Sequence, residues 1–560
     1  MSFPDRALGS FLGLALGDAY GRPLEFISGA RVRTAPVPIR PGEFVWTDDT
    51  HMSLYLAEAV LAQGPDRLND DSFGNAVGAA FSRWLDDPLT PSTAPGTTCT
   101  AGVRSWRRSR DWRTSGVADS DGCGAVMRVA PLGIAFAGDE LDRVAAISAQ
   151  VTHGHPNASE AAVATCRLLR AALEHGRFDA ELVETVIARQ PGESVVTDAL
   201  RAALREAQGP WDGWLDEAAI PAGDGGWRSP SALGLAVAAA LRWGADFATA
   251  IEKAARINGD SDSVAAIAGM LLGAAGGSAA LPSTWCDAIR DRPTITASAN
   301  ALVARGQPWI AVADLHGRRD RLEALAAWAE VHRPAARLAL LGDYVDNGPD
   351  VPGLLDLILQ LSAARGEQLV AIAGNHDIAC SRALETLGTP EEAFWTNKWQ
   401  RGHWNADGDT PSRYGAAAGD VAELAKRMPE AHRRFLAGLP WFVDTGRWLF
   451  VHAGLEPGAI APQLEVLQTR PAREGLHYED GRDRGLPAAI RGHTLDRSAD
   501  PGWERVVVTA HSYHQPPPAW EGPNRIALHA NDTPSEDVFA VVLPERTYLR
   551  LGADGTVAVG

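Results

Sequence analysis

The chain is organised around the stretch Leu341-Gly342-Asp343-Tyr344-Val345-Asp346-Asn347-Gly348-Pro349-Asp350. It follows an apolar run, Arg337–Leu340, that is typical of a buried strand. The glycine places Asp343 at the carboxyl end of this strand, where open α/β sheets bind ligands. Three carboxylates on one short loop repel one another, and a bound cation would neutralise them. A surface turn is the alternative, because Asp, Asn, Gly and Pro are all turn formers.

Four further apolar runs in the C-terminal half also end in polar residues. Alternate strand residues share a face, so the two polar residues of an Asp-x-His sequence point the same way. Mixed nitrogen and oxygen ligands suit Mn, Fe or Zn better than Mg. Apolar runs that alternate with helical patterns predict an α/β sheet. The polar residues are Asp314 and His316 after Ile310–Ala313, Asn375 and His376 after Leu369–Ala373, His452 after Trp448–Val451, and His511 after Val506–Thr509.

These motifs resemble those of the metallophosphoesterases, specifically the phosphoprotein phosphatase type, over about residues 308–545. The resemblance implies a calcineurin-like α/β sandwich that holds two divalent ions of the Mn²⁺, Fe or Zn type and hydrolyses a phosphoester. It also implies that His376 is the general acid for the leaving oxygen and that Asp346 orients its imidazole. The implied ligands are Asp314, His316 and Asp343 for one ion, and Asp343 as bridge, Asn375, His452 and His511 for the other.

Two positions in this half bear on the substrate and the ligands. Asn347 stands where protein phosphatases carry a phosphate-binding arginine. An amide cannot form a charged bidentate clamp, which favours a nucleotide or small phosphoester over a phosphorylated protein. His493 competes with His511 for the last ligand position, and His511 is preferred because it ends an apolar run. A Trp-rich insertion over roughly Phe394–Tyr414 is predicted to be a lid or a surface excursion.

The N-terminal half is rich in Ala and Leu at helical spacing as far as about Leu281, which predicts a largely helical domain. Gly9, Gly13, Gly17 and Gly21 recur every four residues. On a helix they would form a ridge that another backbone can approach closely. Because each glycine costs roughly 1 kcal/mol in a helix interior, four imply a packing demand. The alternative is that this segment is partly loop.

Two acidic clusters, Trp46–Thr50 and Asn258–Ser263, each precede an apolar helix. Asp, Ser and Thr are good N-caps, so capping alone is one interpretation. Each cluster, however, supplies more groups than one cap needs. Carboxylates with hydroxyls form a hard oxygen set that suits Mg²⁺ or Mn²⁺.

The N-terminal motifs together resemble the ADP-ribosylglycohydrolase family over residues 1 to about 280. They are Gly17-Asp18-Ala19-Tyr20-Gly21-Arg22-Pro23-Leu24-Glu25, Thr47-Asp48-Asp49-Thr50, Ser120-Asp121-Gly122-Cys123-Gly124-Ala125-Val126-Met127-Arg128-Val129-Ala130-Pro131 and Gly259-Asp260-Ser261-Asp262-Ser263. Cys123 stands where the family commonly has Asn, and Ser263 stands where Thr is commoner.

This second resemblance implies an all-α domain that cleaves a glycosidic bond from ADP-ribose to an acceptor. Two Mg²⁺ would polarise the ribose hydroxyls and orient a water, and an aspartate would take the water's proton. Asp48 and Asp49 are the implied catalytic aspartates. The implied substrate-binding residues are Glu25, Gly122, Gly124 and His153, and the implied Mg²⁺ ligands are Thr47, Asp48, Asp49, Asp260, Asp262 and Ser263.

Bulk properties bound the domain count and the partners. A chain of 560 residues is too long for one core, and we expect domains at 1–295 and 307–560 joined by a linker at 296–306. The net charge of −18 excludes strong nonspecific nucleic-acid binding. Five scattered cysteines predict no disulfide framework and a reducing, cytoplasmic location. No apolar run approaches the ~20 residues of a membrane span, so no membrane partner is expected.

The chain is therefore expected to be a bifunctional hydrolase that acts on an ADP-ribosylated substrate and on a phosphoester. The ADP-ribose could be carried by a protein, a nucleic-acid end or a small molecule. One hypothesis is that both halves act on a single phosphate-linked ADP-ribose substrate. In the alternative, they are an independent protein de-ADP-ribosylase and a nucleotide, dinucleoside polyphosphate or protein phosphatase. A third interpretation makes one half an ADP-ribose binding module.

Overall fold

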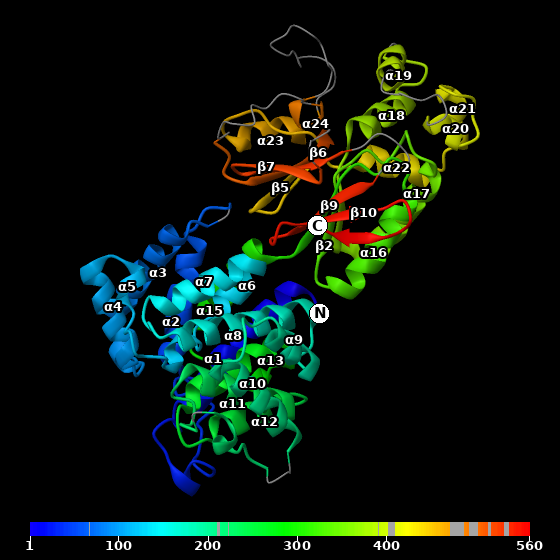
Figure 1. Ribbon diagram of the computed structural model, residues 1–560. Helices are drawn as coiled ribbons and strands as arrows, with labels where there is room; N and C mark the ends of the chain where they lie inside the picture. Colours follow the sequence, from blue (N-terminus) through cyan, green and yellow to red (C-terminus); the bar gives the residue numbers. More distant parts are fainter. Residues whose placement is uncertain are drawn as a thin grey trace. The chain divides into compact units, whose positions relative to one another are not determined.

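The chain folds as two compact units, Met1–Gln307 and Pro308–Gly560 (Figure 1). The first unit is helical, and the second is a mixed α/β unit with two sheets, which confirms the predicted fold classes. The computed structural model describes residues 1–66, 68–209, 213–221, 223–389, 391–400, 409–470, 487–491, 502–512, 517–530 and 537–560.

Within the described part of the chain, no helix is both long enough and apolar enough to cross a membrane.

The first unit is a stack of helices built around α1 and α13. The helices are α1 (Phe3–Gly21), α2 (Asp48–Leu61), α3 (Asp70–Asp86), α4 (Thr97–Ser109), α5 (Trp112–Ser115), α6 (Ala130–Ala135), α7 (Gly138–Gln150), α8 (Pro156–His175), α9 (Ala180–Ala188), α10 (Val195–Gln208), α11 (Ser229–Trp243), α12 (Phe247–Ala255), α13 (Ser261–Gly276), α14 (Ser283–Ala288) and α15 (Arg292–Gly306).

The glycine ridge of α1 lies directly against the backbone of α13. A Cβ placed on Gly13 would overlap the carbonyl oxygen of Gly269, and a Cβ on Gly17 would overlap that of Ala265. At the end of the ridge, Gly21 meets the backbone of Asp262. All four glycines lie within the helix, so the loop alternative is wrong. The ridge thus brings the end of α1 next to the second acidic cluster.

The linker predicted at 296–306 is instead the body of α15. Ile295, Ala299 and Leu302 follow one another at helical spacing and are buried, and α15 packs against α1, α2 and α6. Pro293 does not interrupt this helix, because proline is tolerated in the first turn of a helix and Pro293 occupies that turn. The two units therefore adjoin at Gln307 and Pro308 without a polar linker.

The second unit contains eleven strands in the described residues. They are β1 (Trp309–Val312), β2 (Arg337–Leu340), β3 (Leu369–Ala371), β4 (Phe442–Asp444), β5 (Trp448–Val451), β6 (Val506–Ser512), β7 (Ala519–Gly522), β8 (Arg525–His529), β9 (Val538–Leu543), β10 (Thr547–Leu551) and β11 (Val557–Val559). The helices are α16 (Arg319–His332), α17 (Val351–Arg365), α18 (Asn375–Glu385), α19 (Glu392–Gln400), α20 (Thr410–Arg413), α21 (Val421–Arg427), α22 (Glu430–Gly438), α23 (Ile460–Gln468) and α24 (Ala488–Arg491).

The strands form two sheets, in the orders β11-β10-β9-β1-β2-β3 and β4-β5-β6-β8-β7. Strands β1, β2 and β3 are parallel neighbours, as are β5 and β6. Alternate residues divide between two cores: Trp309 faces Phe450 between the sheets, with ring centroids 5.2 Å apart, whereas Ile310 joins the core formed with α16 and α17. Figure 1 shows α16 and α17 beside the first sheet. The parallel strands bring their carboxyl ends, and the polar residues after them, to common edges.

Candidate functional site

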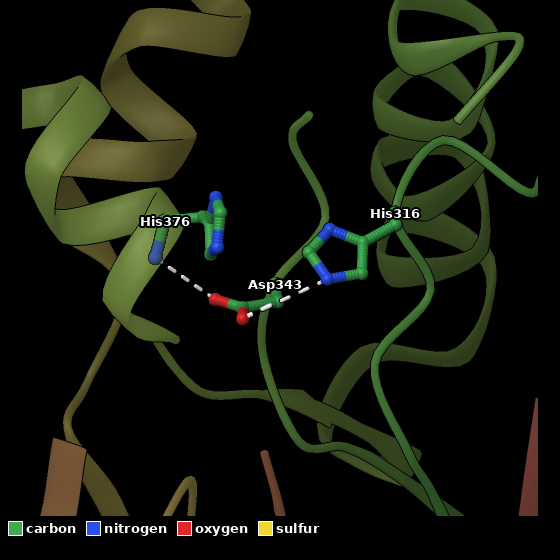
Figure 2. Close-up of side chains that lie close together, drawn as sticks. All are labelled: His316, Asp343 and His376. Carbon is green, nitrogen blue, oxygen red and sulfur yellow. Dashed lines mark hydrogen bonds and ion pairs between the residues drawn. The ribbon is translucent and has the colours of Figure 1, made fainter. Parts of the chain in front are cut away.

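Asp343 lies at the centre of a cluster of potential metal ligands in the second unit. It belongs to two groups, one with His316 and His376 and one with His452 and His511, and within each group the ligand atoms all lie within 4.8 Å of one another. Figure 2 shows His316, from the loop after β1, and His376, from the start of α18, on either side of Asp343. One carboxylate shared by two groups is the arrangement expected for a two-ion site with a bridging ligand.

The remaining predicted ligands of this half lie in the same cluster. Asp314 Oδ1 accepts the backbone N–H of His511 over 3.2 Å and lies 3.8 Å from His452 Nδ1. Asn375 Oδ1 lies 3.1 Å from His452 Nε2. His493, the alternative to His511, lies outside the described residues. The structure therefore brings together all six predicted ligands of the second unit.

The backbone of this cluster is strained. Non-glycine residues seldom adopt positive φ, and where they do so the site is often functional. Asp377, which the sequence interpretation did not single out, holds the loop: its carboxylate accepts the N–H groups of Tyr344 and Gly374, each over 2.9 Å. The residues of this cluster and loop with positive φ are His316, Asp343, Asp346, Asn347 and His511.

The carboxylates and imidazoles of the cluster shift one another's pKa values. Burial raises the pKa of Asp343, but His452 and His376 outweigh burial and hold that pKa well below its ordinary value. Burial lowers the pKa of His452, but Asp343 and Asp314 outweigh burial and raise that pKa to about 9. Asp343 is therefore an ionised, buried carboxylate, with Oδ2 only 3.3 Å from His452 Nε2. Carboxylate and imidazole in contact form a donor set that suits Mn, Fe or Zn.

Asp346 and His376 form a hydrogen-bonded pair beside the cluster. Asp346 Oδ2 lies 2.9 Å from His376 Nδ1, and Asp346 is fully buried. Trp399 and Thr410, from the Trp-rich insertion, also donate to Asp346. The sequence interpretation did not predict either contact. The tryptophans in an otherwise polar insertion were the feature that could have indicated a buried contact.

The third carboxylate of the central stretch has a different role. Asp350 is the N-cap of α17, and its Oδ1 accepts the N–H of Gly353 over 2.9 Å. Asp350 thus caps a helix, whereas Asp343 and Asp346 lie in or beside the cluster.

In the first unit, the two acidic clusters meet. Ser263 Oγ on α13 donates to Asp49 Oδ1 on α2 over 3.5 Å. Cys123 Sγ, from the glycine loop, donates to Asp260 Oδ2 over 2.6 Å. Thr47 and Asp260 also serve as the N-caps of α2 and α13, so the capping interpretation holds for these two residues.

Burial makes this oxygen-rich cluster costly without a counter-charge. It raises the pKa of Asp48 to about 8 and that of Asp260 to about 6. It also raises the pKa of Glu25 to about 9, with Asp262 adding to the effect. Within the described part of the chain, Asp49 Oδ2 is buried with no hydrogen-bond partner. Mutually repelling carboxylates and an orphaned oxygen fit a hard divalent cation such as Mg²⁺.

Asp18 positions this site and was not predicted as a site residue. It lies on α1 and is buried, and burial raises its pKa to about 6. Its carboxylate accepts Thr47 N over 2.7 Å, Thr50 N over 3.0 Å and Thr50 Oγ1 over 2.6 Å. Asp18 thereby fixes the turn that presents Asp48 and Asp49. The sequence feature that could have indicated this role is the place of Asp18 in the first motif, directly after a glycine of the ridge.

The predicted substrate-binding glycines lie over His153. A Cβ on Gly122 would come 3.3 Å from His153 Nε2, and one on Gly124 would come 2.9 Å from His153 Cε1. His153 is buried, burial lowers its pKa to about 3, and its Nδ1 lies 2.8 Å from Thr152 Oγ1. A neutral His153 thus supports the glycine loop.

The chain matches the ADP-ribosylglycohydrolase family over residues 1–311 and the calcineurin-like phosphoesterase family over residues 308–533. An uncharacterized protein from Archaeoglobus fulgidus is 33% identical over 301 residues, which cover 50% of this chain and 90% of that protein. The ADP-ribosylarginine hydrolase Tri1 of Pseudomonas putida is 29% identical over 299 residues, covering 51% of this chain and 74% of that protein. A solved structure described as an ADP-ribosylglycohydrolase-related protein complex is 28% identical and covers 55% of this chain and 99% of its own, with a TM-score of 0.43.

Both matched families are hydrolases and are typically metal-dependent. The first match spans more than half of the chain, and the second covers residues 308–533 of the unit that contains the Asp343 cluster. The chain belongs to the ADP-ribosylglycohydrolase family and carries a calcineurin-like phosphoesterase domain after the glycohydrolase domain.

Proposed function

We propose that this chain is a bifunctional hydrolase with two separate metal-dependent sites. The first unit cleaves a glycosidic bond between ADP-ribose and an acceptor, and the second hydrolyses a phosphoester. The observation that carries the first activity is the convergence of Asp49 and Ser263 from two distant motifs. The observation that carries the second is Asp343, which two groups of ligands share.

In the first unit, two Mg²⁺ would be held by Thr47, Asp48, Asp49, Asp260, Asp262 and Ser263. Such ions polarise the ribose hydroxyls and make a water more acidic. Asp48 or Asp49 accepts the proton of the water that attacks the anomeric carbon. Glu25, next to Asp262, borders the site, and Gly122 and Gly124 let the substrate approach the backbone closely.

In the second unit, Asp314, His316, Asp343, Asn375, His452 and His511 would hold two ions of the Mn²⁺, Fe or Zn type. Such a pair neutralises the phosphate charge and orients the attacking water. Asp346 holds the Nδ1 side of His376, so that Nε2 donates a proton to the leaving oxygen.

Asn347 supports a small phosphoester or nucleotide as the substrate of the second unit. Its side chain is only 2% exposed, and its Nδ2 has no hydrogen-bond partner among the described residues. A buried amide N–H without a partner costs free energy unless a ligand accepts it. A neutral single donor cannot form the charged bidentate clamp that an arginine gives a phosphorylated side chain.

The acceptor that best explains the fusion is a phosphate. Cleavage of ADP-ribose from a phosphorylated ribose or a nucleic-acid end leaves a phosphoester, which the second unit could then hydrolyse. The alternative is two independent activities. The name of the Pseudomonas putida relative favours an ADP-ribosylated arginine as the acceptor in that case.

A panel of substrates tests the proposal. The purified chain is incubated with Mg²⁺ and Mn²⁺ and with an ADP-ribosylated phosphate end, an ADP-ribosylarginine peptide, nucleotides and p-nitrophenyl phosphate. Release of ADP-ribose and then inorganic phosphate from the first substrate supports coupling. Turnover of only the arginine peptide and the nucleotides supports independent activities. If the chain binds ADP-ribose but releases none from any linkage, the first unit is a binding module and the glycohydrolase proposal fails.

A further inference from the structure

The insertion that follows α18 contacts the acid–base pair of the second unit. Asp346 Oδ2 accepts from His376 Nδ1 over 2.9 Å and from Trp399 Nε1 over 2.7 Å. Asp346 Oδ1 accepts the backbone N–H of Thr410 over 3.1 Å and its hydroxyl over 2.5 Å. Trp399 belongs to α19, and Thr410 begins α20. The insertion therefore supplies donors to both oxygens of the carboxylate that holds His376.

The two oxygens of Asp346 are constrained differently. Thr410 holds Oδ1, but a carboxylate can still turn about its last torsion, whose preferred range is broad. Trp399 removes that freedom, because its indole N–H holds Oδ2 in the direction of His376 Nδ1. An imidazole whose Nδ1 side is held in this way keeps one ring orientation and one tautomer.

We propose that Trp399 is a positioning residue for phosphoester hydrolysis and that it acts through Asp346 on His376. The inference rests on the proposed phosphoesterase function of the second unit. By this proposal, Trp399 does not touch the substrate. Its N–H sets where Asp346 holds the imidazole, and so where Nε2 lies when the leaving oxygen needs its proton.

A purely structural role is the competing explanation, because Trp399 is 1% exposed and belongs to the hydrophobic core of the second unit. The two roles differ in their kinetic consequences. A misplaced general acid slows the hydrolysis of esters with poor leaving groups, since those leaving oxygens depend on protonation. Loosened packing slows good and poor leaving groups alike.

The experiment compares p-nitrophenyl phosphate, which has a good leaving group, with phenyl phosphate, which has a poor one. In the full-length chain with Mn²⁺, Trp399→Phe keeps a ring in the core but removes the N–H. We expect kcat/KM for phenyl phosphate to fall at least about 10-fold, within the range of general-acid contributions. We expect kcat/KM for p-nitrophenyl phosphate to fall by less than about 3-fold, because its leaving group needs little protonation.

The matched control is Trp503→Phe. Trp503 is also buried in the second unit, and its Nε1 donates to the Glu456 carbonyl over 3.0 Å, so this variant also loses a buried indole hydrogen bond. Its kcat/KM should change by the same factor for p-nitrophenyl phosphate and for phenyl phosphate. A Trp399→His variant, which can supply an N–H donor, should recover part of the phenyl phosphate activity and serves as the second variant if Trp399→Phe does not fold.

Equal losses on both substrates in Trp399→Phe, or the same selectivity in Trp503→Phe, would overturn the positioning role while leaving the phosphoesterase proposal intact. If the unaltered chain hydrolyses neither ester nor any nucleotide, the proposed function itself fails and the inference fails with it.

Discussion

Gly13 of α1 and Gly269 of α13 touch backbone to backbone, and a Cβ on either one would overlap the carbonyl oxygen of the other. This contact controls the first site, because α1 carries Asp18, which fixes the turn with Asp48, and α13 begins with the second acidic cluster. Backbone atoms cannot move aside as a flexible side chain can. The separation of the two acidic clusters is therefore set by residues without side chains.

Gly13→Ala should destabilise the first unit and lower the release of ADP-ribose. The added methyl overlaps backbone, and overpacking of this kind typically costs about 1–3 kcal/mol. Thermal unfolding and ADP-ribose release measure the two effects, and phosphoester hydrolysis should not change. Gly64→Ala is the control, because a Cβ there meets no atom of the described residues within 4 Å. An unaltered melting temperature in Gly13→Ala would contradict the close contact.

Asp49→Asn should abolish ADP-ribose release and spare phosphoester hydrolysis, and Asp343→Asn should do the reverse. Each loses a charged ligand candidate from one site only. Since altering a residue that merely orients a ligand costs about 10–100-fold, each loss should reach about 100-fold or more. Both activities are measured on the same preparations. Loss of both activities in one variant would show that the sites are not separate.

Asp350→Ala should reduce stability without affecting phosphoester kinetics. Asp350 caps α17, and loss of a cap typically costs about 1 kcal/mol, or about 2–4 °C in melting temperature for a domain of this size. Differential scanning calorimetry and kcat on p-nitrophenyl phosphate check the two effects. A fall in kcat comparable to that of Asp343→Asn would place Asp350 in the site after all.

The metal-free first unit should lose stability as pH rises from 5 to 8.5. The pKa of Asp48 is raised to about 8 and that of Glu25 to about 9, mainly by burial. Above the unfolded values near ~4, the folded chain therefore retains protons that the unfolded chain has released, and rising pH favours unfolding.

Thermal unfolding in EDTA across this range measures the effect, and the melting temperature should fall by at least about 3 °C. Saturating Mg²⁺ should remove most of the fall at pH 8. Asp48→Asn, which is uncharged at every pH, should flatten the profile. A melting temperature that rises with pH in EDTA would mean that the carboxylates are not crowded as described.

The sequence by itself determined both fold classes and named most of the residues that the structure brings together in the two candidate sites. Each motif combines a structural signal with a chemical one in a few neighbouring residues: a strand end with Asp343, or a helix start with Asp48. Such short-range patterns can be recognised from the sequence alone, because a strand or helix positions its own terminal residues.

Only the tertiary structure decided which distant residues complete these motifs. Trp399 lies 53 positions from Asp346, and Asp18 lies 29 positions from Thr47. Residues 296–306 are likewise helical because Ile295, Ala299 and Leu302 are buried where α15 packs against α1, α2 and α6. Such contacts form when whole elements pack together, since hydrogen bonds and buried area between them depend on the path of the entire chain rather than on local spacing.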